Sequence, residues 1–175
     1  GTGPKAGGPL YMLRLMTRHP ASAARTALTR TAAKVPDLSA QRILQAPLQA
    51  LSDWAAQHQR SRARTACAAH AESACAGMLC TLPGPTGERN EYRVLPREQV
   101  LCIAPDDDAL LVQLSAVLAV GSRALWPSTA QTLHAQLPAA VQQRIVLASD
   151  WSRDSVHFDA VLHDSHDQDH LHLAP

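Results

Sequence analysis

Two glycine-rich stretches of this chain have the composition of phosphate-binding loops. GTGPKAGG occupies residues 1–8, and GPTGERN occupies residues 84–90. A loop of this kind is expected to end in GK[ST], or to follow the GxGxxG pattern after a strand, and neither stretch meets either requirement. We therefore interpret both as sharp turns, in which glycine adopts backbone angles that other residues avoid.

Histidines and aspartates gather near the end of the chain. His166 and His170 are one helical turn apart, so they could hold a metal ion together. Zinc requires a third protein ligand and hydrogen-bonding partners that orient the ligands, and the sequence identifies neither. We interpret this stretch as a solvated loop and assign no metal ligand to it. The histidines are His157, His163, His166, His170 and His172, with Asp159, Asp164, Asp167 and Asp169 among them.

The cysteines do not form a recognisable reactive or metal-binding pattern. They are Cys67, Cys75, Cys80 and Cys102. Their spacing is neither CxxC nor that of a disulfide framework, so we interpret them as buried or free thiols of a protein in a reducing cytoplasm. No Ser/His/Asp or Cys/His arrangement stands out either, and we assign no catalytic residue.

The composition excludes several classes of protein. The net charge is +1, and the longest basic cluster is Arg60, Arg62 and Arg64, so nothing indicates nucleic-acid binding. No apolar run approaches the roughly 20 residues of a membrane span. Apolar residues make up 46% of the chain but aromatic residues only 3%, so the core must consist mainly of Ala, Leu and Val. The first residue is Gly1 and the last is Pro175, and we expect the chain to be a piece of a longer protein.

Helical patterns dominate the first half. Residues 10–16 form an apolar run that fits a strand or a last helical turn, and residues 21–33 are weakly helical. The clearest amphipathic helix is predicted over residues 38–59, with Pro47 as a kink or a restart. Its apolar face is predicted to hold Ile43, Leu44, Leu48, Leu51, Trp54 and Ala55.

A second helix is predicted over residues 63–78. Gly77 is expected to stop it, because glycine is favoured just beyond a helix end. Its buried face is expected to consist of small residues, namely Ala66, Ala69, Ala74 and Ala76.

After residue 82 the chain alternates short apolar runs with helical patterns. The runs are predicted strands at residues 100–104, 124–126, 145–148 and 158–162. Helices are expected to begin at Asp106 and Ser128, with a further helical turn at residues 141–144, and Gly121 should end the first helix. This alternation predicts an α/β protein with a Rossmann-like, mainly parallel open sheet, preceded by a helical segment.

The first strand-to-helix turn is the place where a Rossmann domain would bind its cofactor. Residues 104–108 read APDDD there. This turn has no glycine to permit a close approach of the backbone, and its three carboxylates would repel a pyrophosphate. The sequence therefore predicts a Rossmann-like module that does not bind a nucleotide.

Two segments of the chain, the second in two parts, resemble a known family, the bacterial proline utilization A proteins. GTGPKAGGPLYMLRL at residues 1–15 is similar to the end of the family's aldehyde dehydrogenase domain. LPGPTGERNEYRVLPREQVLCIA at residues 82–104 and LVQLSAVLAVGSRALWP at residues 111–127 are similar to the C-terminal module of its longer members. The family motifs include Gly1, Thr2, Gly3, Pro4 and Lys5, and then Gly84, Pro85, Thr86, Gly87, Glu88, Arg89 and Asn90, all expected to be structural.

The resemblance implies a multifunctional oxidoreductase of proline catabolism. Family members combine an FAD-dependent proline dehydrogenase with an NAD-dependent glutamate-semialdehyde (pyrroline-5-carboxylate) dehydrogenase, and the intermediate passes between them by substrate channelling. The implied C-terminal module binds no cofactor, packs on the aldehyde dehydrogenase domain and helps to seal the tunnel. The parent is expected in the cytoplasm, with peripheral association to the inner membrane, and its catalytic residues lie outside this chain.

The resemblance also implies how the chain is divided. Residues 1–20 would be the tail of the aldehyde dehydrogenase domain, residues 21–81 a helical connection, and residues 82–175 the incomplete Rossmann-like module. The main expected partner is the rest of the parent chain. Two alternatives remain: an independent nucleotide- or ligand-binding domain, and an interaction module that docks through the helix at residues 38–59.

The first 80 residues are expected to lack their natural cover. This half is therefore expected to be poorly ordered or packed against a second copy. Its uncovered apolar faces would be Leu10/Leu13/Leu15 and Leu44/Leu48/Leu51. The sheet is expected to be covered by its own helices.

Overall fold

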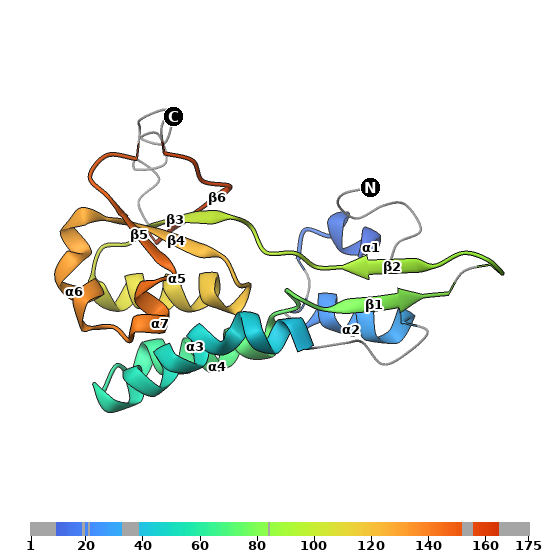
Figure 1. Cartoon of the computed structure of the whole chain (residues 1–175), viewed down its shortest axis with the longest axis horizontal. Helices are drawn as coiled ribbons and strands as arrows, with labels where there is room; N and C mark the ends of the chain where they lie inside the picture. The colour runs from blue at the N-terminus through green and yellow to red at the C-terminus, as the bar shows by residue number, and fades with distance from the viewer. Residues whose placement is uncertain are drawn as a thin grey trace.

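The computed structural model describes residues 10–18, 20, 22–32, 39–83, 85–151 and 156–164, which form two lobes side by side (Figure 1). A hairpin lobe contains α1 (Tyr11–Arg14), α2 (Ala23–Thr31), β1 (Leu79–Leu82) and β2 (Asn90–Arg93). A sheet module contains α3 (Ser39–Gln57), α4 (Ser61–Ser73), β3 (Gln99–Ile103), α5 (Asp107–Ala119), β4 (Arg123–Pro127), η1 (Ser128–Ala130), α6 (Gln131–Gln136), α7 (Ala139–Gln142), β5 (Ile145–Ala148) and β6 (Ala160–His163).

The sheet module is built on four parallel strands in the order β5-β4-β3-β6. The chain moves outward from β3 to β4 to β5 and then returns to the other side of β3. In the register, Val100 of β3 stands beside Ala124 of β4 and Ala160 of β6. The predicted parallel open sheet is confirmed, and each predicted strand overlaps an observed one. The strand order reverses at β3, as it does at the switch point of a doubly wound sheet.

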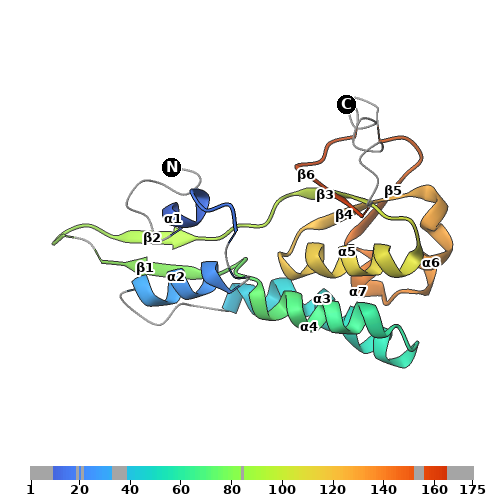
Figure 2. The ribbon, with the colours of Figure 1, turned by 180° about the vertical axis from the view of Figure 1, so that it is seen from behind.

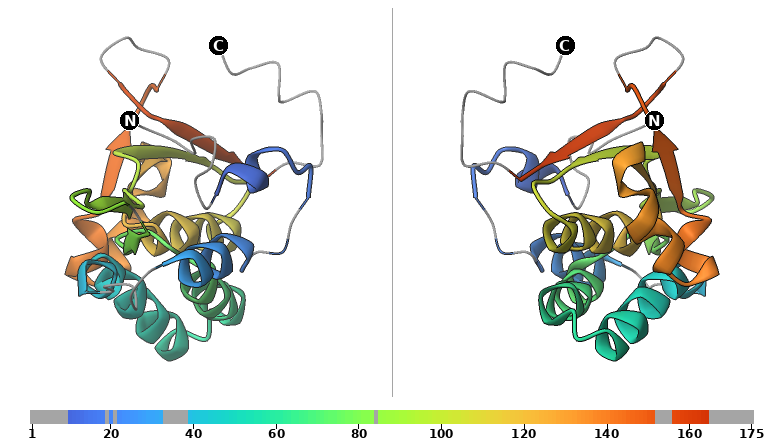
Figure 3. Two further views of the ribbon diagram at one scale, coloured as in Figure 1. Left: turned by 90° about the vertical axis from the view of Figure 1, so that its right-hand side faces the viewer. Right: turned by 90° about the vertical axis from the view of Figure 1, so that its left-hand side faces the viewer.

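Helix α5 lies between the sheet and the antiparallel pair α3–α4, so one side of the sheet carries two helical layers (Figure 3). Apolar residues of α5, including Leu111, Leu114 and Val117, are therefore buried from more than one side. A helix that is apolar around most of its circumference is expected in this position. Cys102 and Trp126 face α5 from the sheet and belong to the same core. The expectation that helices cover the sheet holds for this face.

Helix α3 is packed into the core of its own chain. Leu48, Leu51 and Trp54 are buried among side chains of α4, α5 and the sheet. The expectation that this face lacks cover is therefore wrong for Leu48 and Leu51, whereas Leu44 is only half-buried. Pro47 lies inside α3 without dividing it, so the predicted restart is not observed.

Ile43 is an exposed member of the predicted apolar face of α3. It is 74% exposed, although it was expected to be buried with Leu48. Ile43 lies eleven positions before the buried Trp54, which places the two side chains only about 20° apart around a helix of 3.6 residues per turn. The prediction for Ile43 is wrong because it lies near the start of α3, before Leu48, the first residue of the helix in the core cluster.

Helix α4 ends at Ser73, four residues before the predicted stop at Gly77. Its buried residues are Ala63 and Cys67. Of the predicted small-residue face, Ala74 and Ala76 are buried beyond the end of the helix, whereas Ala66 is half-buried and Ala69 is exposed. Gly77 has a φ of +82°, and a Cβ added there would come within 2.6 Å of the backbone nitrogen of Gln41. Gly77 is therefore the point where the turn before β1 approaches the start of α3, and not the end of a helix.

The ends of the helices around α5 follow local rules with one exception. The side chain of Asp106 caps α5, and Gly121, with a φ of +76°, follows its end as predicted. Ser128 was expected to cap a helix, but it is the first residue of the 3-10 turn η1, and the N-cap position belongs to Pro127. Pro127 ends β4 directly at this turn, which leaves no residue between the strand and the helical segment.

The hairpin lobe has a small core of its own. β1 and β2 pair antiparallel, with Cys80 opposite Tyr92. Leu28 of α2 packs on this hairpin, and Met78 and Cys80 lie in the same cluster. The predicted helix at residues 21–33 is confirmed by α2, and the run at residues 10–16 contains the short helix α1. Figure 2 shows the hairpin extending away from the sheet module.

Candidate functional site

The turn between β3 and α5 is closed by the chain's own carboxylates. The Asp106 carboxylate accepts a hydrogen bond of 2.8 Å from the backbone N–H of Ala109. Asp108 pairs with the Arg60 guanidinium at 2.9 Å. In a Rossmann domain the N–H groups at this helix start receive the pyrophosphate, which here would meet Asp106, Asp107 and Asp108 instead. The geometry of the turn therefore disfavours a nucleotide at this position.

The second glycine-rich stretch forms the exposed end of the β1–β2 hairpin. The N–H of Glu88 donates a 3.1 Å hydrogen bond to the carbonyl of Pro85. Gly87 stands at the third position of this turn with a φ of +90°, which a type II turn requires and glycine adopts readily. Thr86 is exposed beside it, and Asn90 begins β2. The stretch is thus a turn, as predicted, and its described residues do not enclose a phosphate site.

The remaining motif residues of this stretch take part in a surface charge cluster. Arg89 and Arg93 both pair with Glu91, and these hydrogen bonds, those from Arg89 first, lower the pKa of the Glu91 carboxyl. Gly84 and the predicted motif at residues 1–5 lie outside the described residues.

All four cysteines are buried free thiols, as expected. Burial raises the pKa of Cys102 to about 12, although a contact with the Trp126 side chain acts in the opposite direction. Burial likewise raises the pKa of Cys67 to about 11. A thiol attacks as its thiolate, so these two groups are protonated and unreactive near neutral pH.

The described part of the His/Asp-rich stretch has a structural function. The Asp159 carboxylate accepts hydrogen bonds from the backbone N–H groups of Glu98 at 2.7 Å and Gln99 at 3.2 Å. Asp159 therefore fastens the start of β6 to the start of β3. Among the described residues, no group of three or more His, Cys, Asp or Glu side chains could hold a metal ion. His166, His170 and His172 lie outside the described residues.

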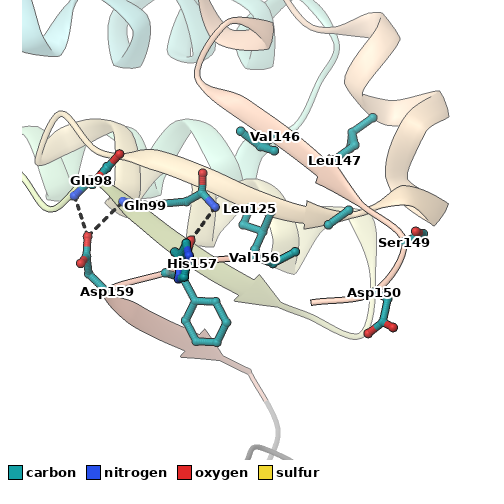
Figure 4. A pocket seen from close by; sticks show the side chains of 12 residues that line it. Glu98, Gln99, Leu125, Val146, Leu147, Ser149, Asp150, Val156, His157 and Asp159 are labelled. Atoms are coloured by element: carbon teal, nitrogen blue, oxygen red, sulfur yellow. Dashed lines mark hydrogen bonds between the residues drawn. The ribbon is translucent and has the colours of Figure 1, made fainter. Parts of the chain in front are cut away.

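A pocket of about 820 Å³ lies on the sheet face opposite α5 (Figure 4). Leu125 and Val146 of β4 and β5 line it, together with Asp150 and His157 from the connection between β5 and β6. The side-chain amide of Gln99 donates a 2.8 Å hydrogen bond to the backbone carbonyl of His157. No paired acid and base converge among its described lining residues. The sequence did not indicate this pocket, because the connection that borders it has no periodic pattern.

One buried polar pair joins α4 to α5. The His70 ring nitrogen Nδ1 lies 2.8 Å from the Ser115 hydroxyl, which itself donates to the carbonyl of Val112. The hydroxyl proton is thereby used, so Ser115 accepts the Nδ1 proton of His70. Burial lowers the pKa of His70. The pair satisfies two polar groups between packed helices, and no carboxylate orients the His70 ring among the described contacts.

Two strongly exposed apolar side chains lie between the two lobes. Leu95, in the linker between β2 and β3, is 76% exposed, and Ile43 of α3 is 74% exposed. A groove of about 400 Å³ separates the linker from α3, and another of about 450 Å³ lies between the linker and the α4–α5 side. Leu95 lines both grooves. We call Ile43, Leu44, Leu79, Leu95, Pro96 and Val120 the junction surface.

The described residues thus form an α/β module with a four-stranded parallel sheet, joined to a small hairpin lobe. None of the described helices is long and apolar enough to span a membrane. No family model matches the chain.

The chain is 50% identical over 174 residues to the bifunctional protein PutA of Escherichia coli strain K12, covering 96% of this chain and 13% of that protein. It is 50% identical over 165 residues to PutA of Salmonella typhimurium LT2, with 93% and 12% covered. It is 33% identical over 157 residues to PutA of Rhizobium meliloti, with 88% and 12% covered. The chain therefore matches one segment of the PutA proteins and spans about an eighth of their length.

Proposed function

We propose that this chain is a non-catalytic part of a longer bifunctional enzyme that oxidises L-proline to L-glutamate. The identity to PutA along nearly the whole chain carries this proposal. PutA is the proline utilization A family that the glycine-rich motifs resemble. The proline dehydrogenase would use FAD and the semialdehyde dehydrogenase NAD, both bound elsewhere in the longer protein.

The role that we propose for this region is a lid and scaffold on the aldehyde dehydrogenase domain. Two features of the described residues support it. The carboxylates of Asp106 and Asp108 occupy the turn where a cofactor would bind. The buried Cys67 and Cys102 have raised pKa values, so neither is suited to act as a nucleophile. A module that keeps the parallel-sheet topology, but has neither an open cofactor turn nor a reactive thiol, is suited to pack on the aldehyde dehydrogenase domain and to enclose the tunnel.

We also propose the division of the chain that the resemblance implies. Residues 1–20 would end the aldehyde dehydrogenase domain, residues 21–81 would connect, and residues 82–175 would belong to the C-terminal module. Helices α3 and α4 of the connection share one core with the sheet, so the connection is also part of the module's packing.

The lid function is tested by removing residues 39–164 from the longer protein. We expect proline oxidation with an artificial electron acceptor, and NAD reduction with added semialdehyde, to continue in the shortened enzyme. The lag before NADH formation from proline should be several-fold longer than in the intact protein, because the intermediate escapes before its second oxidation. The intact protein is the control, and the flavin content of both proteins checks their folding.

An unchanged lag would contradict the sealing function. Loss of NAD reduction in a shortened protein that keeps its flavin and its thermal transition would contradict the non-catalytic assignment. Saturable binding of NAD to the 175-residue chain itself would favour the alternative of an independent nucleotide-binding domain.

A further inference from the structure

We propose that the junction surface is the place where this chain docks on the rest of the longer protein, and that the docking partner is an apolar surface edged by carboxylates. This inference rests on the proposed function and adds the position and the chemistry of the contact.

The junction surface combines exposed apolar side chains with concave shape. Ile43 and Leu95 are about three-quarters exposed, and Val120 is exposed beside the second groove. Single exposed apolar residues are common, but a cluster around two grooves is typical of an interaction site. Leu95 stands between the grooves, so one partner surface can fill both and bury Leu95 at its centre.

The charged residues that line the grooves indicate which charges the docking partner should carry. Arg93 lines the groove beside α3, and Arg97 lines the groove beside α4 and α5. No described carboxylate lines either groove. Arg93 also contacts Glu91 at 3.4 Å, which leaves Arg97 as the more available cation. Interfaces place opposite charges against each other, so the partner should present carboxylates next to its apolar centre.

The rest of the parent chain fits this surface better than a second copy does. This chain covers only 13% of its E. coli relative, so most of such a protein lies outside it. A covalently linked partner is present at high effective concentration and needs little contact area to remain docked. In a symmetric dimer the same patch would face itself, which would bring the arginine-lined grooves of both copies together. Such like-charge contacts are unfavourable.

Cysteine labelling of Ile43→Cys and Leu95→Cys tests the docking. Maleimide reaction at each site is measured by peptide mass spectrometry, in the 175-residue chain and in the longer protein. The native thiols near these sites are buried, so they provide a slow background. Gln131→Cys on the exposed side of α6 is the matched control. We expect both test sites to react at least tenfold more slowly in the longer protein, at every protein concentration, and the control to react equally in both.

The charge requirement is tested by a second substitution in the longer protein. Arg97→Glu should restore at least half of the reactivity of Cys at position 43, whereas Arg97→Lys should not. Equal labelling of the test sites in both proteins would overturn the docking surface. Protection that disappears on dilution would show a second copy instead, and would also overturn it. Equal effects of Arg97→Glu and Arg97→Lys would overturn the carboxylate edge.

The outcome is separable from that of the proposed function. Lag-free NADH formation from proline by the longer protein, together with unprotected labelling at residues 43 and 95, would reject the junction surface alone. A lag that is the same with and without this region would reject the lid function, whatever the labelling shows.

Discussion

At the scale of single residues, two glycines have nearly the same backbone angle in very different surroundings. Gly77 has a φ of +82° and touches the backbone of α3, whereas Gly87 has a φ of +90° and has no atom within 4 Å of an added Cβ. Both positions favour glycine because of their positive φ, but only position 77 also lacks room for a Cβ atom. The first joins the two lobes, and the second shapes an exposed turn.

This difference predicts unequal effects of the same substitution. Gly87→Ala should lower the free energy of unfolding by about 1–2 kcal/mol, the cost of a left-handed conformation. Gly77→Ala should cost about 1–3 kcal/mol more, because its methyl group forces the backbone of Gln41 to move. Urea denaturation of both variants measures the difference. Equal losses would show that the approach of α3 to this turn is not tight.

At the scale of elements, α3 shows how an amphipathic helix can have two functions. The face with Leu48, Leu51 and Trp54 belongs to the core of the sheet module. Ile43 lies near the start of the helix, before its first core residue Leu48, and is 74% exposed. The same helix therefore stabilises its own module and offers a residue to a partner.

Two alanine substitutions on α3 separate these functions. Leu51 is fully buried, so Leu51→Ala should lower the free energy of unfolding by about 2–5 kcal/mol. Ile43→Ala should change it by less than about 0.5 kcal/mol, because the side chain is mostly in solvent. Thermal unfolding of the 175-residue chain gives both values. A large loss for Ile43→Ala would mean that its side chain is buried in the chain's own fold.

At the scale of the whole molecule, the chain has two cores that differ in size. The larger core extends through the sheet, α5 and the α3–α4 pair. The smaller core has Leu28, Cys75, Met78 and Cys80 at its centre, between α2 and the hairpin. A core of this size supports less stability than the larger one, because less apolar surface is buried.

The two cores should respond separately to a cavity. Leu28→Ala removes a fully buried side chain from the smaller core, so the amide protons of β1 and β2 should exchange at least tenfold faster. The amides of β3 and β4 should keep their protection, because their core is unchanged. Native-state hydrogen exchange measures both. Equal acceleration in all four strands would indicate that the lobes unfold as one unit.

The sequence by itself determined the parallel sheet, the start of α5 at Asp106 and the turn at Gly87, because these depend on local periodicity, the helix dipole and backbone preference. It also placed three adjacent carboxylates at the turn between β3 and α5. Only the tertiary structure decided that Ile43 lies outside the core, why residue 77 is glycine, and that Leu95 stands between two grooves. Each of these depends on contacts between segments far apart in the chain, such as Gly77 with Gln41, and no local pattern encodes such a contact.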